Sequence, residues 1–355
     1  LFLIRGSQES AGYGLNIALS TLACLAAAAA SYALFGLPWA AGLTALFLAL
    51  SPVAMTYAAT ADLSSVCLLW TALAWLAVFR AGKDPSRRKL WAAGLTLAAA
   101  LHARPDGVLL LPPFLWLLSK HGRKAVGPMA VAALASLPLF FLAWSARAAG
   151  HDGYGDDWSS LLSRVPLQGL ENLWFFLKPG SPRPLLLAAA AWGFWLHRRE
   201  RPARALAASA GLYFLLYAAY PTSAFARGSG DKYALSLELP LALLAGLGAA
   251  RVLDKRRDLL LLAVGAAGLL APLSIRPTSD ANYAASDAFL RKARPFLKNG
   301  PPVLSFVPPA PRVVHGVAVV HPKLLLEQGP AQLDPRGDGF LLLRDEASDF
   351  RPADA

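Results

Sequence analysis

The sequence predicts an all-α polytopic membrane domain of about ten transmembrane helices, followed by a small C-terminal α/β domain outside the membrane. Three observations lead to this fold class. The 355 residues are 56% hydrophobic and only 16% charged, and the mean hydropathy is +0.44. Apolar runs of about 15 to 25 residues recur, each ended by Gly, Pro or a charge cluster, which is typical of polytopic membrane proteins. From residue 276 onward the chain is instead polar and rich in proline.

Ten apolar segments are predicted to form the helices of the membrane domain. They span approximately 13–35, 37–58, 62–80, 90–104, 107–119, 125–146, 184–197, 203–220, 233–252 and 258–275. The chain starts with LFLIRGSQES, without Met or a signal peptide, and this start is similar to the end of a loop that follows an earlier helix. We therefore expect the true N-terminus to precede this sequence.

The net charge of +12 is distributed in short clusters between the apolar segments, which fits membrane topology better than nucleic-acid binding. Lys and Arg number sixteen in one alternating set of loops and eight in the other. The richer set comprises the clusters at 80–89, 120–124, 198–204 and 251–257. Because cytoplasmic loops carry the excess of Lys and Arg, this set is predicted to be cytoplasmic. Both chain ends and the long loops are then predicted to lie outside.

The segments 62–80 and 90–104 are joined by a turn that carries the basic cluster at 80–89, which is predicted to be cytoplasmic. Asp62 and Asp106, at the far ends of these segments, are therefore both expected at the outer face. Segments 90–104 and 107–119 would reach only about 20 Å each at 1.5 Å per residue, which is too short to cross roughly 30 Å of hydrocarbon. Their shared tip, the tetrad RPDG at 104–107, should therefore lie in a recess. Two interpretations stay open: an ordinary turn in which Arg104 pairs with Asp106 or a lipid phosphate, and a lining of a substrate cavity.

The predicted outer loops differ from one another. Within 147–183, the part 161–177 is expected to lie on the membrane surface as an amphipathic helix. Three aspartates in this loop miss the calcium-loop spacing and predict a hydrated acidic loop, so no metal site is assigned. In the loop 220–233, Arg227 and Lys232 lie on a Gly- and Ser-rich hinge that suits a phosphate, although a solvated loop is the alternative.

Glu238 follows within an apolar helix, beside Pro240. An intramembrane carboxylate is a functional candidate, but Glu238 could equally reach the surface or pair with Lys232. The tail is predicted to contain a helix at 281–297, strands at 302–307 and 312–320, a helix at 322–328 and a strand at 339–344. The chain therefore divides into a membrane domain, 1–275, and an extracytoplasmic α/β domain, 276–355.

Several short motifs together resemble a known family. These are SPVAMTYAATAD before a helix, then LWAAGLTLAAALHARPDG, and later DKYALSLELPLALLAGLGA. With the tail segment AASDAFLRKARPFLKNGPPVLSF, they resemble the bacterial polytopic glycosyltransferases of the C-type fold, which include relatives of the protein O-mannosyltransferases and the lipid A aminoarabinose transferases. In the late motif, Lys232 stands where the family typically has Arg, and Glu238 stands near a position where Pro is common.

The resemblance implies an enzyme of the bacterial cytoplasmic (inner) membrane that transfers a sugar from a polyprenyl-phosphate donor to a glycan, lipid or protein acceptor. It implies that the main general base lies in an outer loop before residue 1, and that Asp62 is a second outer-face acid that orients the acceptor or a metal. By the same resemblance, the candidate phosphate or sugar contacts are Arg104, Arg227 and Lys232, supported by Asp106 and Tyr233. Glu238 is a further substrate-binding candidate. No cofactor is identified, although a divalent cation stays open.

Two function classes rival the enzyme. A transporter or flippase of lipid-linked sugars would also place charges in a cavity, but it usually has two related halves, which the sequence lacks. A non-catalytic membrane scaffold is the other alternative. Cys24 and Cys67 lie in apolar segments without metal spacing, and there is no P-loop, GxGxxG, GxSxG or HExxH motif. The sequence does not specify the donor sugar, the acceptor or the oligomeric state.

Overall fold

The structure is a computed structural model that describes most of the helical part of the chain. The described residues are 9–58, 63–148, 158–179, 181–220, 224–226, 228–253, 265, 303–304, 319–320 and 341–342. Contacts divide the chain into two compact units: one is Tyr13–Ile275, and the other combines Leu1–Gly12 with Arg276–Ala355. The division into a membrane domain and an extracytoplasmic domain stays a prediction.

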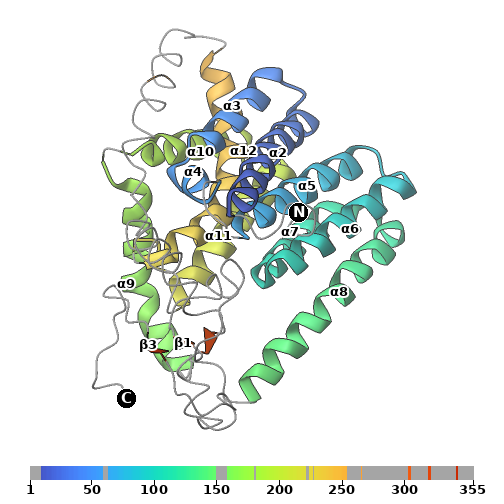
Figure 1. The fold of residues 1–355 in the computed structure, drawn as a ribbon. Helices are drawn as coiled ribbons and strands as arrows, with labels where there is room; N and C mark the ends of the chain where they lie inside the picture. The colour runs from blue at the N-terminus through green and yellow to red at the C-terminus, as the bar shows by residue number, and fades with distance from the viewer. Residues whose placement is uncertain are drawn as a thin grey trace. The chain divides into compact units, whose positions relative to one another are not determined.

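The helical unit consists of α-helices (Figure 1), with three short 3-10 helices among its described elements. Its elements are α2 (Glu9–Phe35), α3 (Pro38–Ala49), α4 (Pro52–Ala58), α5 (Ser64–Lys83), α6 (Arg87–Ala103), η1 (Pro105–Leu110), α7 (Leu111–Leu118), η2 (Ser119–His121), α8 (Arg123–Ala148), α9 (Trp158–Leu177), α10 (Arg183–His197), α11 (Arg201–Ala219), η3 (Gly228–Tyr233) and α12 (Ala234–Leu253). The predicted apolar segments up to 233–252 therefore coincide with helices. The last one, 258–275, lies outside the described residues apart from Gly265.

Fewer helices qualify as membrane spans than the sequence predicts. Among the described residues, three are long and apolar enough: Gly14–Phe35, Ser64–Lys83 and Asp231–Val252. The pair α3 and α4 forms a fourth candidate, bent by 66° at the break between them. Several other predicted segments form helices that are short for a span, since α6 has 17 residues, α10 has 15 and α7 has 8. The number of about ten spans therefore stays a prediction.

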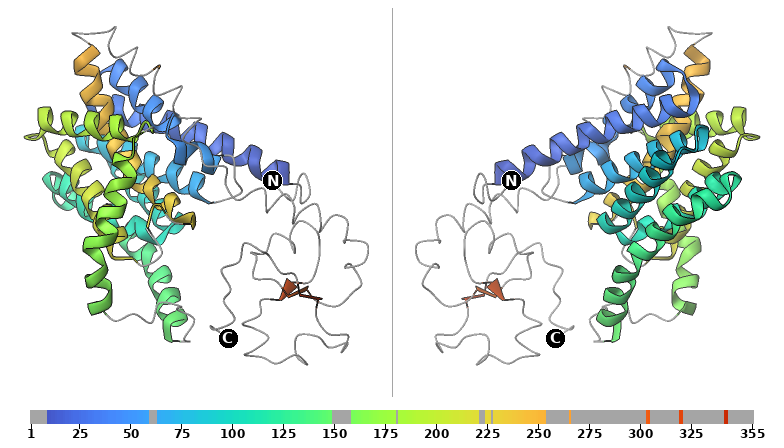
Figure 2. Two further views of the ribbon diagram at one scale, coloured as in Figure 1. Left: turned by 90° about the vertical axis from the view of Figure 1, so that its left-hand side faces the viewer. Right: turned by 90° about the vertical axis from the view of Figure 1, so that its right-hand side faces the viewer.

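Helix α12 lies at the centre of the helical unit and packs against α3, α10 and α11. Most residues of its candidate span, Asp231–Val252, are buried inside the unit. The contact with α10 is close because glycines meet there: a Cβ on Gly193 would lie 2.0 Å from the Leu244 carbonyl oxygen. Small residues of this kind let membrane helices approach each other closely. On another side of the unit, α5, α6 and α8 lie side by side (Figures 1 and 2).

The RPDG tetrad breaks the chain as predicted. Helix α6 ends at Ala103, Arg104 is extended, and Pro105 begins the 3-10 helix η1. Gly107 favours close packing, because a Cβ at this position would make a tight contact, 3.0 Å from the carbonyl oxygen of Ala100. The turn therefore folds back tightly against the last turns of α6, which fixes where Arg104 and Asp106 emerge.

The described part of the tail consists of three two-residue strands. They are β1 (Val303–Leu304), β2 (Val319–Val320) and β3 (Leu341–Leu342), and they form a parallel sheet in the order β2-β1-β3. Each strand falls within one of the three predicted strands. The predicted helices 281–297 and 322–328 lie outside the described residues, so the α/β domain as a whole stays a prediction.

Candidate functional site

The candidate site is built around the ion pair of the RPDG turn. Arg104 Nε lies 3.2 Å from Asp106 Oδ1, and the two side chains are only 17% and 12% exposed. The two charges meet because α6 ends just before Arg104 and the 3-10 turn begins at Pro105, between them. The attraction within a half-buried ion pair offsets the cost of removing both charges from water only if further hydrogen bonds satisfy the remaining donors and acceptors.

Those further bonds come from two other helices. The Tyr217 hydroxyl on α11 donates to Asp106 Oδ2, and the Ser236 hydroxyl on α12 donates to the same oxygen over 3.5 Å. Arg104 Nη2 donates to the Tyr217 hydroxyl oxygen at 3.3 Å, and Nη1 donates to the Lys232 carbonyl at 3.5 Å. Arg104 and Asp106 therefore join α6, α11, η3 and the start of α12 in one polar network.

Aromatic rings enclose this network. The Arg104 guanidinium carbon lies 4.6 Å from the centre of the Tyr233 ring, which in turn lies 5.1 Å from the Tyr217 ring. The Lys232 ammonium lies 5.7 Å from the Tyr233 ring centre. Rings at these distances attract cations through their negative faces. Two positive groups are thus held beside Tyr233.

A cavity of about 570 Å³ opens beside the network. This volume falls within the range of small-ligand sites. Its lining comes from five elements and their flanks: Leu63, Ser64, Cys67, Ala103, Arg104, Pro105, Asp106, Val108, Leu109, Leu216, Tyr217, Tyr220, Lys232 and Tyr233. Arg104 therefore pairs with Asp106 as in the first interpretation, and the pair also lines a cavity. That this cavity binds a substrate stays a prediction.

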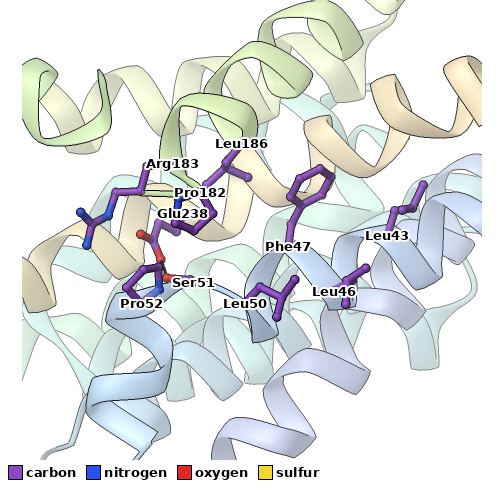
Figure 3. A pocket seen from close by; sticks show the side chains of 10 residues that line it. All are labelled: Leu43, Leu46, Phe47, Leu50, Ser51, Pro52, Pro182, Arg183, Leu186 and Glu238. Atoms are coloured by element: carbon purple, nitrogen blue, oxygen red, sulfur yellow. Dashed lines mark hydrogen bonds between the residues drawn. The ribbon is translucent and has the colours of Figure 1, made fainter. Parts of the chain in front are cut away.

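The structure brings some of the sequence-predicted residues together and separates another. Arg104, Asp106, Lys232 and Tyr233 line the one cavity, although they come from two distant stretches of the chain. Glu238 lines a different cavity, together with Ser51 and Arg183 (Figure 3). The alternative in which Glu238 reaches the surface is wrong, because the residue is only 1% exposed.

Asp62 and Arg227 lie outside the described residues, so their roles stay predictions. The described chain beside Asp62 belongs to the site, because Leu63 and Ser64 line the cavity. On the other side of the gap, the Tyr57 hydroxyl donates to Asp231 Oδ1 at 2.6 Å, next to Lys232.

Sequence reasoning missed Tyr217, whose hydroxyl contacts both members of the ion pair. A signal was present, because Tyr213, Tyr217 and Tyr220 recur at helical spacing in the otherwise apolar 203–220. Tyrosines on one face of an apolar helix indicate a place where polar hydroxyls need partners.

Sequence reasoning also missed two amides on α9. Gln168 Nε2 donates to the carbonyls of Tyr217 and Tyr220, at 2.6 and 2.5 Å. Asn172 Nδ2 donates to the Tyr217 carbonyl at 3.2 Å, while its Oδ1 accepts from the Phe225 backbone at 2.9 Å. The carbonyls at the end of α11 lack helical partners, and these amides satisfy them. The predicted helix is thus present as α9, and two of its polar side chains hold the end of α11 in place. Its position on the membrane surface stays a prediction.

No metal centre emerges from the part of the chain that the structure describes. Within it, no group of three or more His, Cys, Asp or Glu side chains could hold a metal ion. The described residues of the site place cations and hydroxyls around a ligand-sized cavity.

Comparison with known proteins adds to this geometry. Residues 1–144 match the family model of dolichyl-phosphate-mannose-protein mannosyltransferases. The match includes Arg104 and Asp106 but ends before α11 and α12. It supports a membrane glycosyltransferase of the mannosyltransferase type. No curated protein matches the chain at a significant level.

Proposed function

We propose that this protein is a membrane glycosyltransferase that moves a sugar from a polyprenyl-phosphate donor to an acceptor at the outer face of a bacterial cytoplasmic membrane. The observation that carries the proposal is the cavity of about 570 Å³ lined by Arg104, Asp106 and Lys232. The matched family supports it, since its name specifies a lipid-phosphate sugar donor. The acceptor is a glycan, a lipid or a protein.

The donor's phosphate would lie against the cations of the cavity. As the sugar leaves, negative charge grows on the phosphate, and fixed positive groups stabilise it most effectively in a site shielded from water. Arg104 is held by Asp106, Tyr217 and the Lys232 carbonyl, so it supplies a fixed charge that does not reorient. We assign Lys232, with Arg227 from the same hinge, as the direct phosphate contact, and Tyr233 as the ring that positions both cations.

The acceptor side of the reaction needs a carboxylate. Asp106 is a poor candidate for proton transfer, because its oxygens already accept from Arg104, Tyr217 and Ser236. We therefore assign Asp106 as a positioning residue. Asp62 stays the proposed active-site carboxylate that orients the acceptor or a metal, and it is supported by the position of its chain neighbours Leu63 and Ser64 at the cavity.

A second function has one specific observation in its favour. The 66° bend between α3 and α4 resembles the broken helices that line transport sites. A flippase of lipid-linked sugars would therefore use the same cations to move a donor and not to cleave it. The two functions differ in whether the sugar leaves its lipid.

The test is a reconstituted assay with a labelled polyprenyl-phosphate sugar, in which both transfer to acceptor and movement of the intact lipid across the bilayer are measured. We expect transfer, and we expect Asp62→Asn to reduce it by roughly a hundredfold or more, the scale of a positioned acid–base or electrostatic group. Asp84→Asn, at an exposed turn, is the matched control and should leave transfer unchanged. Translocation without transfer would establish the flippase. Equal transfer activity of the two variants would show that Asp62 does not belong to the active site.

A further inference from the structure

The two turns that precede α8 and α11 are strongly basic. Residues 119–124 carry three Lys or Arg side chains and residues 198–204 carry four, and the only carboxylate among them is Glu200. Glu200 Oε1 already lies 2.6 Å from His197 Nδ1. In the described part of the chain, none of these seven cations forms an ion pair. Such a concentration of positive charge attracts an anion.

Arg204 links the two basic turns to each other. Its guanidinium carbon lies 5.3 Å from the centre of the Trp116 ring on α7, and a ring at this distance attracts the cation. Its Nη2 donates to the Arg199 carbonyl at 3.4 Å. A guanidinium has five N–H donors, so Arg204 is held in place and still has donors for a further partner.

The antiparallel arrangement of α7 and α11 brings two more cations to the same end. The turn η1, before α7, contacts the end of α11, whereas the end of α7 meets the start of α11. Lys120 follows Trp116 by about one helical turn, and it is exposed. Arg201 precedes Arg204 by about one turn, and it is exposed as well. Lys120, Arg201 and Arg204 therefore lie together at one end of this helix pair.

The exposed face of α11 continues from the cations as an apolar strip. Beyond Arg204, the exposed residues of α11 recur at helical spacing and are Ala208, Gly211 and Leu215. The strip is open, because a Cβ on Gly211 would meet no atom within 4 Å. On α7, Leu115 lies next to the tryptophan that carries Arg204 and is 50% exposed. Cations at one end of an open apolar strip are complementary to an amphiphile with an anionic head and a hydrocarbon tail.

The chemistry of the anion follows from the cations. Arginine guanidinium groups bind phosphate oxygens in pairs, and lysine adds a point charge. Basic groups at the ends of membrane helices attract anionic lipid head groups. A free phosphate ion would use the cations but gain nothing from the apolar strip. The strip therefore favours a lipid phosphate over a soluble one.

We propose that α7 and α11 bind an anionic phospholipid at this end of the helix pair. Its phosphate lies among Lys120, Arg201 and Arg204, and an acyl chain follows Ala208 and Gly211. The site is at the opposite end of α11 from the proposed sugar-transfer cavity, and it does not depend on that function.

The test compares two lipids that differ in net charge. The purified full chain in detergent is equilibrated with phosphatidylglycerol or phosphatidylethanolamine with identical acyl chains, and native mass spectrometry measures how much of each lipid it retains. We expect at least about a tenfold preference for phosphatidylglycerol, because each cation near an anionic lipid contributes about fivefold. Equal retention of the two lipids would overturn the proposal. Excess inorganic phosphate at fixed ionic strength should not displace phosphatidylglycerol, and displacement would make this a site for free phosphate instead.

Paired variants separate a defined site from general surface charge. Lys120→Gln combined with Arg201→Gln removes two charges at exposed positions, and the preference should fall below about threefold. Arg87→Gln combined with Arg88→Gln, at the exposed start of α6, removes the same charge and is the matched control. The control should keep the preference within about twofold of the unaltered protein. Equal losses in the two double variants would show that net charge, and not this site, retains the lipid.

A second measurement locates the lipid on the unaltered protein. Phosphatidylglycerol with a photoreactive diazirine in its acyl chain is bound and irradiated, and peptide mass spectrometry finds the adducts. We expect them on the exposed face of α11 between Ala208 and Leu215, and at Leu115 on α7. Labelling of α2, which also exposes apolar side chains such as Leu22 and Leu25, should be much weaker. Equal labelling of α2 and α11 would refute the assignment.

Discussion

Removal of the Tyr217 hydroxyl is the most direct perturbation of the Arg104 network. Tyr217→Phe keeps the ring, which is only 2% exposed, so the variant creates no cavity in the core. It removes the bond to Asp106 and the acceptor of Arg104 Nη2. Asp106 keeps Arg104 and the longer contact with Ser236. A hydrogen bond to a charged group contributes about 1.5–3 kcal/mol, and the remaining partners place the expected loss near the lower end, about 1.5–2 kcal/mol.

The same helix offers a matched control. Tyr213 lies one turn before Tyr217, is equally buried and stacks on it with ring centres 6.0 Å apart. Among the described residues, however, the Tyr213 hydroxyl makes no hydrogen bond. Tyr213→Phe removes the same atom from the same environment, so it should change stability by less than about 0.5 kcal/mol.

Denaturant unfolding of the detergent-solubilised protein measures both variants. A double-mutant cycle with Asp106→Asn isolates the Tyr217–Asp106 bond, and we expect a coupling free energy of about 1–2 kcal/mol. In the transfer assay, Tyr217→Phe should lower kcat/KM by roughly tenfold, which corresponds to about 1.4 kcal/mol. The reasoning is refuted if Tyr217→Phe costs no more than Tyr213→Phe, or if the cycle with Asp106→Asn is additive.

Two further predictions concern topology and the donor phosphate. Reporter fusions after Arg88, Arg199 and Arg256 should report cytoplasm, and fusions after Gly155, Gly230 and Ser279 should report the outside, because Lys and Arg accumulate in cytoplasmic loops. A cytoplasmic Gly230 would separate Lys232 from the outer face and contradict the proposed site. Polyprenyl phosphate should slow hydrogen exchange in η3 while the free sugar should not, because Lys232 and Arg227 gain charge-assisted bonds only to an anion. Replacing both cations with Gln should abolish the slowing and raise the donor's KM; normal donor binding by this double variant would place the phosphate elsewhere, with Arg104 the next candidate.

The elements of the fold were predictable because local signals define them. Apolar runs ended by Gly, Pro or charge located the helices up to α12, and the three short strands fall within predicted ones. The break at the RPDG tetrad was predictable as well, since Pro105 cannot continue a helix without losing a backbone bond. The number of spans was less predictable, because an apolar run that forms a helix need not be long enough to cross a bilayer.

Half of the site was predictable by residue type. Arg104 and Asp106 are charges between two apolar segments, and such groups are usually functional or paired in membrane proteins. Lys232 lies on a Gly- and Ser-rich hinge that suits a phosphate. Their assembly was not predictable from the sequence, because each partner is far away along the chain. Tyr217 is 111 residues from Asp106, and Ser51 is 187 residues from Glu238.

The sequence by itself determined which segments are helical, where the chain breaks and which polar groups need a partner. Only the tertiary structure decided which partner each received. Helices such as α11 and α12 are apolar around most of their circumference, so their residue patterns do not specify which face meets which neighbour. That choice depends on close contacts between small residues, such as Gly193 against the backbone of α12. Elsewhere in the unit, the packing of η1 against α11 brings Arg104 to Tyr217, while Glu238 lies at a separate cavity. Packing and not sequence proximity sets these distances between helices.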